Sequence, residues 1–398
     1  MVKKWQRNEN SSVSKILKKL CVAASLWFVM LNAQIDLFGY AETEVDQIHL
    51  TEAAYNFGYG KIRIDGEYRP WEGLLLAGNV NGQKYFGKTE WDFFDFLPYD
   101  SIETDNGAMY SMPVSISDTL YLENLYARLN FTKFDLTIGR QPISLGTGYA
   151  WNPLDIFNRK DLLDPTYEQP GVDAVRLEIP LGDRAGVDLI AAREDSTKDY
   201  TKMIQFKTGI GYFDFTINYT RYFHLFPYWR VMDIMTTHTT SNFYGGSFVG
   251  QIGEFGVWGE SIRSSEFIFG YTEYVIGSDH TFDNGLYIMA EYFHNTLGVT
   301  KKELSLYNYF HSYSGESKSL MQNYLFVLAM FSVNDFISGS FMAFGNMDDR
   351  SFSIVPQIEW SAFENISISL FMSQSFGDDD TEFGIQDRAL RLRMRAYL

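Results

Sequence analysis

Apolar and polar residues alternate in short runs along most of this chain, and the clearest runs lie between Leu125 and Gln141. In the first arm, leucine, alanine and phenylalanine fall on one face, while asparagine, tyrosine and arginine fall on the other. A short polar turn at 132–133 leads into a second alternating arm. Period-two alternation on both sides of a tight turn predicts a β-hairpin. Each arm has about the 9–11 residues that a tilted strand needs to cross a bilayer.

The same alternation continues to the last residues, where Arg391, Arg393 and Arg395 alternate with apolar side chains. We count eight hairpins with short turns and one further strand at each end. That makes about 18 strands (16–18), and an even number lets the first and last strands pair antiparallel and close a cylinder. The predicted fold class is therefore all-β. The chain is expected to form a single closed antiparallel transmembrane β-barrel with short periplasmic turns and long extracellular loops.

The less regular stretches set the expected limits of the strands and loops. The first strand is predicted in the weak run from Val45 to Tyr55. Longer excursions are expected at 81–118, 142–171, 225–243 and 295–321. Only ten prolines punctuate the chain, and no linker or change of composition divides it. We therefore expect one domain.

The N-terminus has the pattern of a secretory signal peptide. Six basic residues precede an apolar run at 20–31, and small residues precede a cleavage site after Ala41, with Ala33 as the second choice. The expected arrangement is a signal peptide at 1–41 and an outer-membrane barrel at 42–398. A helical anchor is the less favoured alternative, because the apolar run is too short to span a bilayer.

Charge and cysteine usage narrow the function classes. The whole chain carries a net charge of −17. Removing residues 1–41 takes away six basic and two acidic side chains, so the mature charge is −21. Such acidity argues against binding nucleic acid through its phosphates. The single cysteine lies in the signal peptide, so disulfides do not hold the mature chain together.

No run of 18 apolar residues follows the signal peptide. The mature chain is therefore either soluble and secreted or a closed barrel, since only helices and closed barrels satisfy the backbone in lipid. A soluble sandwich has shorter strands, and a propeller has a blade-length repeat that is missing from this sequence. Strand length, the signal peptide, chain closure and the 17% aromatic content favour the membrane barrel.

The hairpin and the loop after it carry a family resemblance. The segment LYARLNFTKFDLTIGRQPISLGTGYAWNPLDIFN resembles bacterial outer-membrane channels of the alginate-export type and related porin-like families. In those barrels a strand often ends in Gly-Arg-Gln before a long glycine-rich loop, as at 139–141 here. They commonly end on an aromatic residue that is read by the assembly machinery, whereas this chain ends Tyr397-Leu398. The resemblance implies a porin-like barrel in the outer membrane.

Inward-facing charges are the candidate selectivity residues, because a barrel of this size encloses water. Alternation assigns to the lumen Lys61, Arg63, Asp65, Glu67, Arg128, Arg176, Glu178, Lys207, Glu291, Glu359, Arg391, Arg393 and Arg395. One hypothesis is a solute path in which the three arginines of the last strand attract anions. The other is that lumen charges pair across strands and only make the wall rigid.

The loop at 142–171 is the candidate constriction. Its expected members, with the strand end that leads into it, are Arg140, Gln141, Trp151, Asp155 and Arg159. The loop either folds inward and narrows the pore or forms an external cap packed on itself. Its aromatic residues suit stacking on sugar rings, and they equally suit an interfacial belt.

No sequence motif indicates a cofactor, a metal or a catalytic site. Haem, phosphate-loop and zinc motifs are missing, and the acidic run 378–380 with Glu382 lacks the spacing of a calcium loop. The six histidines stand in no recognisable catalytic motif. We therefore predict a non-enzymatic channel for passive or selective diffusion of small hydrophilic solutes, with anions and saccharides as candidates. The alternatives are an outer-membrane hydrolase and a ligand-binding barrel without transport.

The expected surroundings follow from this reading. The predicted location is the bacterial outer membrane. The predicted partners are outer-membrane lipid, lipopolysaccharide, the barrel assembly machinery and a small hydrophilic solute, with no nucleic acid.

Overall fold

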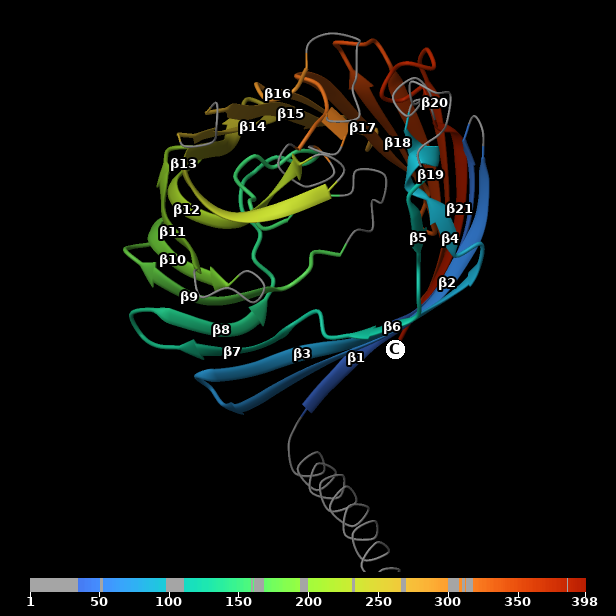
Figure 1. Cartoon of the computed structure of the whole chain (residues 1–398). Helices are drawn as coiled ribbons and strands as arrows, with labels where there is room; N and C mark the ends of the chain where they lie inside the picture. The colour runs from blue at the N-terminus through green and yellow to red at the C-terminus, as the bar shows by residue number, and fades with distance from the viewer. Residues whose placement is uncertain are drawn as a thin grey trace, which may run out of the picture.

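The wall of the molecule is a ring of antiparallel strands (Figure 1). The computed structural model describes residues 35–50, 53–97, 111–158, 160, 168–193, 200–230, 233–265, 270–299, 308–309, 312, 318–384 and 386–398. Within these ranges no helix has the length and hydropathy needed to cross a membrane.

The strands follow one another around the ring almost in chain order. The first half comprises β1 (Ile35–Leu50), β2 (Ala54–Trp71), β3 (Leu74–Gly87), β6 (Thr119–Tyr121), β7 (Leu125–Asn130), β8 (Asp135–Gln141), β9 (Val172–Pro180), β10 (Ala185–Arg193), β11 (Tyr200–Ile210) and β12 (Phe213–Arg230). The second half comprises β13 (Asp233–Ile252), β14 (Phe255–Ser264), β15 (Thr272–Thr281), β16 (Tyr287–Asn295), β17 (Asn323–Asn334), β18 (Ile337–Asn346), β19 (Phe352–Phe363), β20 (Ile366–Phe376) and β21 (Gln386–Tyr397). The excursion after β3 holds β4 (Glu90–Asp92), the 3-10 turn η1 (Phe93–Phe96) and β5 (Pro113–Ser115).

The sheet has 19 described segments, of which β6 and β7 pair in succession with the same strand, β3. They occupy one place in the wall, which makes an 18-strand barrel. The ring closes where β1 pairs with β21, from Tyr40 opposite Tyr397 to Leu50 opposite Gln386. The structure thus confirms the predicted fold class, a closed all-β antiparallel barrel of 18 strands.

The two faces of the wall differ as the alternation predicts. On β2 and β21 the apolar residues face outward, and Ile62 and Leu392 are 56% and 50% exposed. Their neighbours on the opposite face are enclosed: Glu44 and Arg393 are each 3% exposed. Large aromatic residues stand at the turns and strand ends of the outer surface, including Trp71, Tyr212, Phe255, Phe282, Phe336 and Phe363. All six lie beside the short turns, so they form the girdle expected at one of the two membrane interfaces.

Three expected boundaries were wrong. The run from Val45 to Tyr55 is not one strand, because β1 ends at Leu50 and β2 begins at Ala54. The supposed excursion at 225–243 belongs mainly to the β12–β13 hairpin, whose pairing continues to Arg230 opposite Asp233. The excursion at 81–118 begins later than expected, because β3 continues to Gly87. In the last two cases backbone pairing continues past the point where the sequence alternation fades.

The first residues of β1 form part of the wall. Gly39 accepts a hydrogen bond from the backbone N–H of Leu398 at 2.9 Å. The Tyr40 ring lies 6.5 Å from that of Tyr397, edge to face, and the guanidinium of Arg395 lies 4.3 Å above it. A cut after Ala41 would remove these contacts and leave the ends of β2 and β21 without their partner strand.

We therefore expect the mature chain to keep Ile35 to Ala41, with the signal peptide ending before Ile35. N-terminal sequencing and the intact mass of protein purified from the outer membrane will check this. A mature chain that begins at Glu42 would contradict it.

Candidate functional site: the barrel interior

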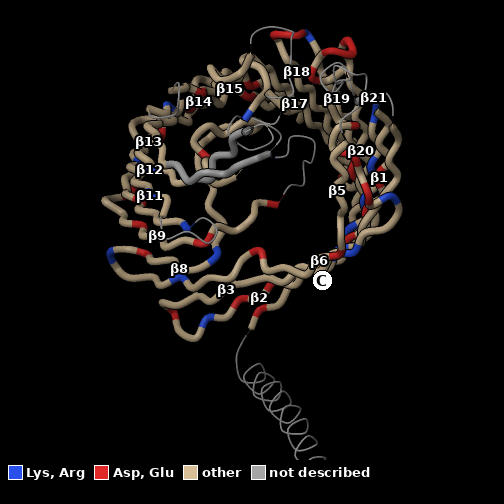
Figure 2. The backbone as a smooth tube through the Cα atoms, in the orientation of Figure 1, with Lys and Arg blue, Asp and Glu red and all other residues tan. Residues whose placement is uncertain are grey.

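Three acid–arginine pairs bridge the seam where the barrel closes. The pairs are Glu42–Arg395, Glu44–Arg393 and Asp46–Arg391, with nitrogen–oxygen distances of 2.5, 2.5 and 2.8 Å. In the strand register, Arg391, Arg393 and Arg395 of β21 each stand directly opposite their acid on β1. Figure 2 shows acidic and basic positions gathered along this part of the ring. The arginine row is therefore neutralised by a row of carboxylates, which favours the hypothesis of a rigid paired wall over that of an open cationic ladder.

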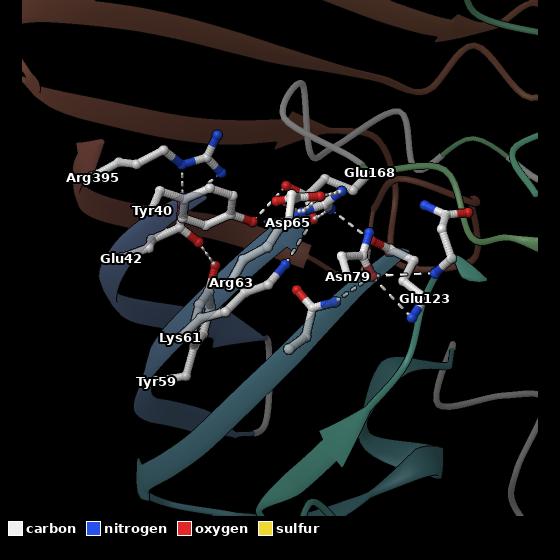
Figure 3. Close-up of polar contacts among 12 residues, drawn as sticks. Tyr40, Glu42, Tyr59, Lys61, Arg63, Asp65, Asn79, Glu123, Glu168 and Arg395 are labelled. Carbon is white, nitrogen blue, oxygen red and sulfur yellow. Dashed lines mark hydrogen bonds and ion pairs between the residues drawn. The ribbon is translucent and has the colours of Figure 1, made fainter. Parts of the chain in front are cut away.

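Arg63 on β2 is the centre of a second cluster (Figure 3). Its guanidinium contacts Asp65 at 2.8 Å, Glu123 at 2.6 Å and Glu168 at 3.0 Å. Lys61, two residues earlier on the same inward face, contacts Glu168 at 2.8 Å. Since Glu168 belongs to the segment that leads into β9, this cluster ties that segment to the wall at β2.

The pKa of Glu168 reflects these contacts. Burial raises it, but hydrogen bonds from Lys61 and Tyr40 and the positive charges of Lys61 and Arg63 outweigh burial. The net result is a pKa below the ordinary glutamate value. Glu168 therefore remains ionised, and the tie to β2 stays intact, at neutral pH.

A third cluster lies on the inner face of β9, β10 and β11. Arg176 contacts Glu178 at 2.8 Å and Asp188 at 2.9 Å, and Lys207 contacts Asp188 at 2.9 Å. Asp188 was missed at the sequence level, although it alternates with Val187 and Leu189 as an inward residue does. The missed acids Glu42, Glu44 and Asp46 follow the same period, hidden by the weak sequence signal of β1.

The remaining predicted lumen residues lie apart from these clusters. Arg128 on β7 donates a long hydrogen bond of 3.4 Å to the hydroxyl of Thr137. Glu67 accepts one from Arg69 at 2.7 Å near a short turn. Glu359 on β19 lines a separate cavity. These three residues therefore join no common ring with the arginines of β21.

The segment 142–158 runs inside the barrel rather than outside it (Figure 1). Ile143 and Leu145, at 0% and 4% exposure, pack against the inner face of β9 to β11. Further along, Leu154 packs against Phe243 and Ile262 of β13 and β14. Trp151 stacks on Phe293 of β16, with ring centroids 5.2 Å apart and an angle of 11°. The segment therefore crosses from one side of the interior to the other.

Two buried carboxylates of the wall hold the backbone of this segment. Glu291 of β16 accepts hydrogen bonds from the N–H groups of Tyr149 at 2.7 Å and Ala150 at 2.5 Å, and from the Trp258 indole at 3.1 Å. The other is Glu260 of β14, whose donors are the backbone N–H groups of Thr147, Gly148 and Leu154. Both carboxylates are at most 4% exposed. Charge-assisted bonds of this kind, five of them to the backbone, fix the route of the segment.

A tight turn completes the attachment of the segment. A Cβ atom built on Gly148 would lie 1.9 Å from the carbonyl oxygen of Trp151, so only glycine fits there. Lys160 donates to the carbonyl oxygens of Gly148 at 2.9 Å and Tyr149 at 2.8 Å. The segment is thus held from the wall and from its own continuation.

The predicted constriction residues separate into three groups. Trp151 and Asp155 are buried inside, and Asp155 accepts hydrogen bonds from the backbone of Phe157 and from Asn158. Burial raises the pKa of Asp155, against the charge of Lys318 and these hydrogen bonds. Gln141 is also buried and donates to the carbonyl of Ala174 at 3.0 Å.

The other two constriction residues do not join this group. Arg140 shares the outward register of Leu125, its partner on β7, and its side chain is 44% exposed beside Asp173. It therefore lies on the outer face of the wall, because it is one residue out of phase with Gln141. Arg159 lies outside the described residues.

Part of the interior is packed with apolar side chains. The sequence alternation did not predict this, because it assigned apolar residues to the outer face and polar residues to a water-filled interior. From β15 to β19 the inward side chains include Val275, Phe293, Phe326, Phe344 and Val355, each at most 3% exposed. They join Ala150 and Trp151 in one apolar cluster. The inward segment is thus packed on this side as a second layer of core, and only the rest of the inner face remains polar.

A cavity of about 470 Å³ lies between Tyr149 of the segment and the ends of strands β16 to β19 that adjoin their short turns. Its lining residues are Tyr149, Gly285, Tyr287, Leu328, Met330, Phe331, Ser332, Ser338, Gly339, Ser340, Met342, Gln357 and Glu359. Most belong to the inward face of β16 to β19. Their position next to the turns at 282–286 and 335–336 puts the cavity at the end of the barrel that carries the chain termini.

The hydrolase alternative would need a histidine beside a nucleophile and an acid. His294 on the outer face contacts Asn323 at 2.9 Å, and Asn323 donates to Asp348 at 2.8 Å. In this group of described residues the hydroxyl of Tyr292 donates to Asn323, and no serine takes part in these three hydrogen bonds. The side chains of His224, His238 and His311 lie outside the described residues. Among described residues, no group of histidine, cysteine, aspartate and glutamate side chains is placed to hold a metal ion.

Comparison with known proteins gives a fold but no sequence relative. No family model and no curated protein matches the sequence. Solved structures do match over nearly the whole chain. The outer membrane protein OprD from Pseudomonas aeruginosa has a TM-score of 0.56 at 8% identity, covering 92% of this chain and 94% of that one. OccAB4 of Acinetobacter baumannii has a TM-score of 0.55 at 7% identity, with 92% and 98% covered.

A third match has the same character. OccK5 (OpdH) of Pseudomonas aeruginosa has a TM-score of 0.53 at 9% identity, covering 91% of this chain and 98% of that one. At such low identity these matches show the fold alone, and the function has to be argued from this chain's own residues.

The seam predicts a stability effect. Arg393→Ala should destabilise the barrel by up to about 3–5 kcal/mol, because it removes the closer of the two cations beside the buried Glu44 carboxylate and leaves only Arg391, at 3.4 Å. The double variant Glu44→Leu with Arg393→Leu should recover much of the loss. Urea unfolding in lipid vesicles, followed by tryptophan fluorescence, measures both. Equal stability of the single variant and the natural chain would show that the pair does not support the seam.

The attachment of the inward segment predicts a local effect. Glu291→Gln removes the negative charge that three donors share, so the amides of Tyr149 and Ala150, which bond to it, should exchange roughly ten- to a hundred-fold faster. Hydrogen–deuterium exchange with mass spectrometry measures this directly. Glu178→Gln, which also loses a charge on the inner wall but touches no part of the segment, is the matched control. Unchanged protection in Glu291→Gln would mean that packing alone holds the segment.

Proposed function

We propose that this chain is a channel of the bacterial outer membrane through which small hydrophilic solutes diffuse. The observation that carries the proposal is the sidedness of a closed 18-strand wall. Leucine, isoleucine and aromatic residues cover its outside, while ionised clusters line a large part of its inside. A barrel with this many strands is wide enough for a water-filled lumen. Ionised side chains on its inner face are stabilised by such water, whereas a sealed apolar interior would not solvate them.

The surroundings follow from the same sidedness. Outer-membrane lipid would cover the apolar belt, and lipopolysaccharide would surround the long loops. The barrel assembly machinery would insert the chain. The fold similarity to OprD and to the Occ proteins supports this location.

The pairing of charges bears on selectivity. The three inward arginines of β21, at 391, 393 and 395, each have a carboxylate partner, and so do Arg63 and Arg176. We therefore propose a channel of weak charge selectivity rather than one built around a cationic path for anions. The segment 142–158 crosses the interior and is fastened at both Glu260 and Glu291. Such a fixed obstruction suits small solutes and not a polymer such as alginate.

The purified protein should form steady ion-conducting pores in planar lipid bilayers. In a salt gradient its reversal potential should indicate little preference between potassium and chloride, because the lumen charges are paired. Vesicle swelling should be fast with monosaccharides and slow with long oligosaccharides. Vesicles that received a heat-unfolded sample of the same protein are the control. An inserted, correctly folded barrel that passes no current would refute the proposal.

A further inference from the structure

The cavity between the inward segment and strands β16 to β19 is lined by one charged residue among the described side chains. That residue is an acid, Glu359. Within the described part of the chain, Glu359 has no hydrogen bond or ion pair. Glu291 and Asp188, by contrast, each have several donors. A carboxylate in a cavity without a protein cation is a natural partner for a cation from solution.

The surrounding charges reinforce this polarity. Tyr287, which lines the cavity, donates a hydrogen bond to Asp279 at 2.8 Å, so a second carboxylate lies on the inner face next to the cavity. The described cation Lys160 lies 5.8 Å from the Tyr149 ring centre, and its ammonium donates to two backbone carbonyls. On the side of β20 and β21, Glu359 faces Ser369, and Arg393 beyond it is bonded to Glu44. The local field in the cavity is therefore negative.

The neutral part of the lining suits a hydroxylated solute. Three serines, at 332, 338 and 340, and the amide of Gln357 point into the same cavity from β17, β18 and β19. The hydroxyl of Ser340 donates to the Gln357 amide oxygen at 3.2 Å, which leaves the amide nitrogen able to donate to a ligand. Leu328, Met330 and Met342 supply apolar surface beside them. The cavity volume of about 470 Å³ lies in the range typical of small-molecule sites.

We propose that this cavity is a binding subsite for small hydroxylated organic cations, of which an amino sugar is the type. The ammonium group would pair with Glu359, the hydroxyls would bond to the serines and Gln357, and the ring face would lie against the methionines and Tyr149. A solute passing the inward segment would rest there before it leaves at the end that carries the termini. This inference rests on the proposed channel function and names the solute class that the channel retains.

One charged sugar and two neutral sugars of the same ring structure test the proposal. Glucosamine at pH 6 carries an ammonium group, whereas glucose and N-acetylglucosamine are neutral. Glucosamine should block the pore current at concentrations roughly tenfold or more below those of the two neutral sugars, as expected for one charge-assisted bond. Glu359→Gln should abolish this difference, and Glu359→Asp should keep part of it.

Glu364→Gln is the matched control, because it removes a carboxylate from the exposed turn five residues away and outside the cavity. Equal block by glucose and glucosamine in the natural protein would overturn the inference, and so would a preference that survives in Glu359→Gln. Isothermal titration of the same sugars into the detergent-solubilised barrel decides the subsite without a current. Amine-selective binding in a barrel that does not conduct would therefore refute the channel while keeping the subsite.

Discussion

In a bilayer, no water is available to satisfy an unpaired backbone N–H or C=O group, and this constraint governs the whole molecule. A row of strands meets it only when its two edges pair with each other. Here the edges are β1 and β21, which come from opposite ends of the chain. The three acid–arginine pairs lie on this seam, so the strongest side-chain contacts coincide with the place where closure has to be secured.

Closing the ring creates a second requirement, because an 18-strand barrel encloses more space than the inward side chains of its wall can fill. The chain fills part of this space with its own segment 142–158. Apolar residues of the segment cover an apolar stretch of the inner wall, and the buried carboxylates of Glu260 and Glu291 receive its backbone N–H groups. The interior is thereby divided into a dry packed side and a charged side along β1, β2 and β21.

Charge pairing has a functional consequence. When a lumen arginine is neutralised by a carboxylate on the neighbouring strand, its contribution to the field in the pore is short-ranged. What a solute meets is then decided by the few groups that lack such a partner. The contacts of Arg63, Arg176 and the β21 arginines all make the wall rigid, whereas Glu359 stands in a cavity lined by hydroxyls and an amide. Selectivity is therefore expected from single sites and not from the number of charges in the wall.

The sequence by itself determined the strands, their number, the closure and the face of most charged residues. Period-two alternation is a local property, and the two-residue period puts Arg63, Arg176 and Arg393 inside whatever their partners are. It failed at Val45 to Tyr55, where the residues between Leu50 and Ala54 include no glycine, proline or asparagine to announce a turn. At Arg140, a resemblance to channel loops suggested a lumen role, whereas the register puts this residue outside.

Only the tertiary structure decided which charges meet and where the segment 142–158 runs. Glu44 and Arg393 lie almost the whole chain apart, and they are neighbours because the cylinder closes. The path of the segment depends on Glu260 and Glu291, which are more than a hundred residues away, and on the room left inside the ring. No local pattern encodes such distances, since they arise from the curvature and circumference of the finished wall.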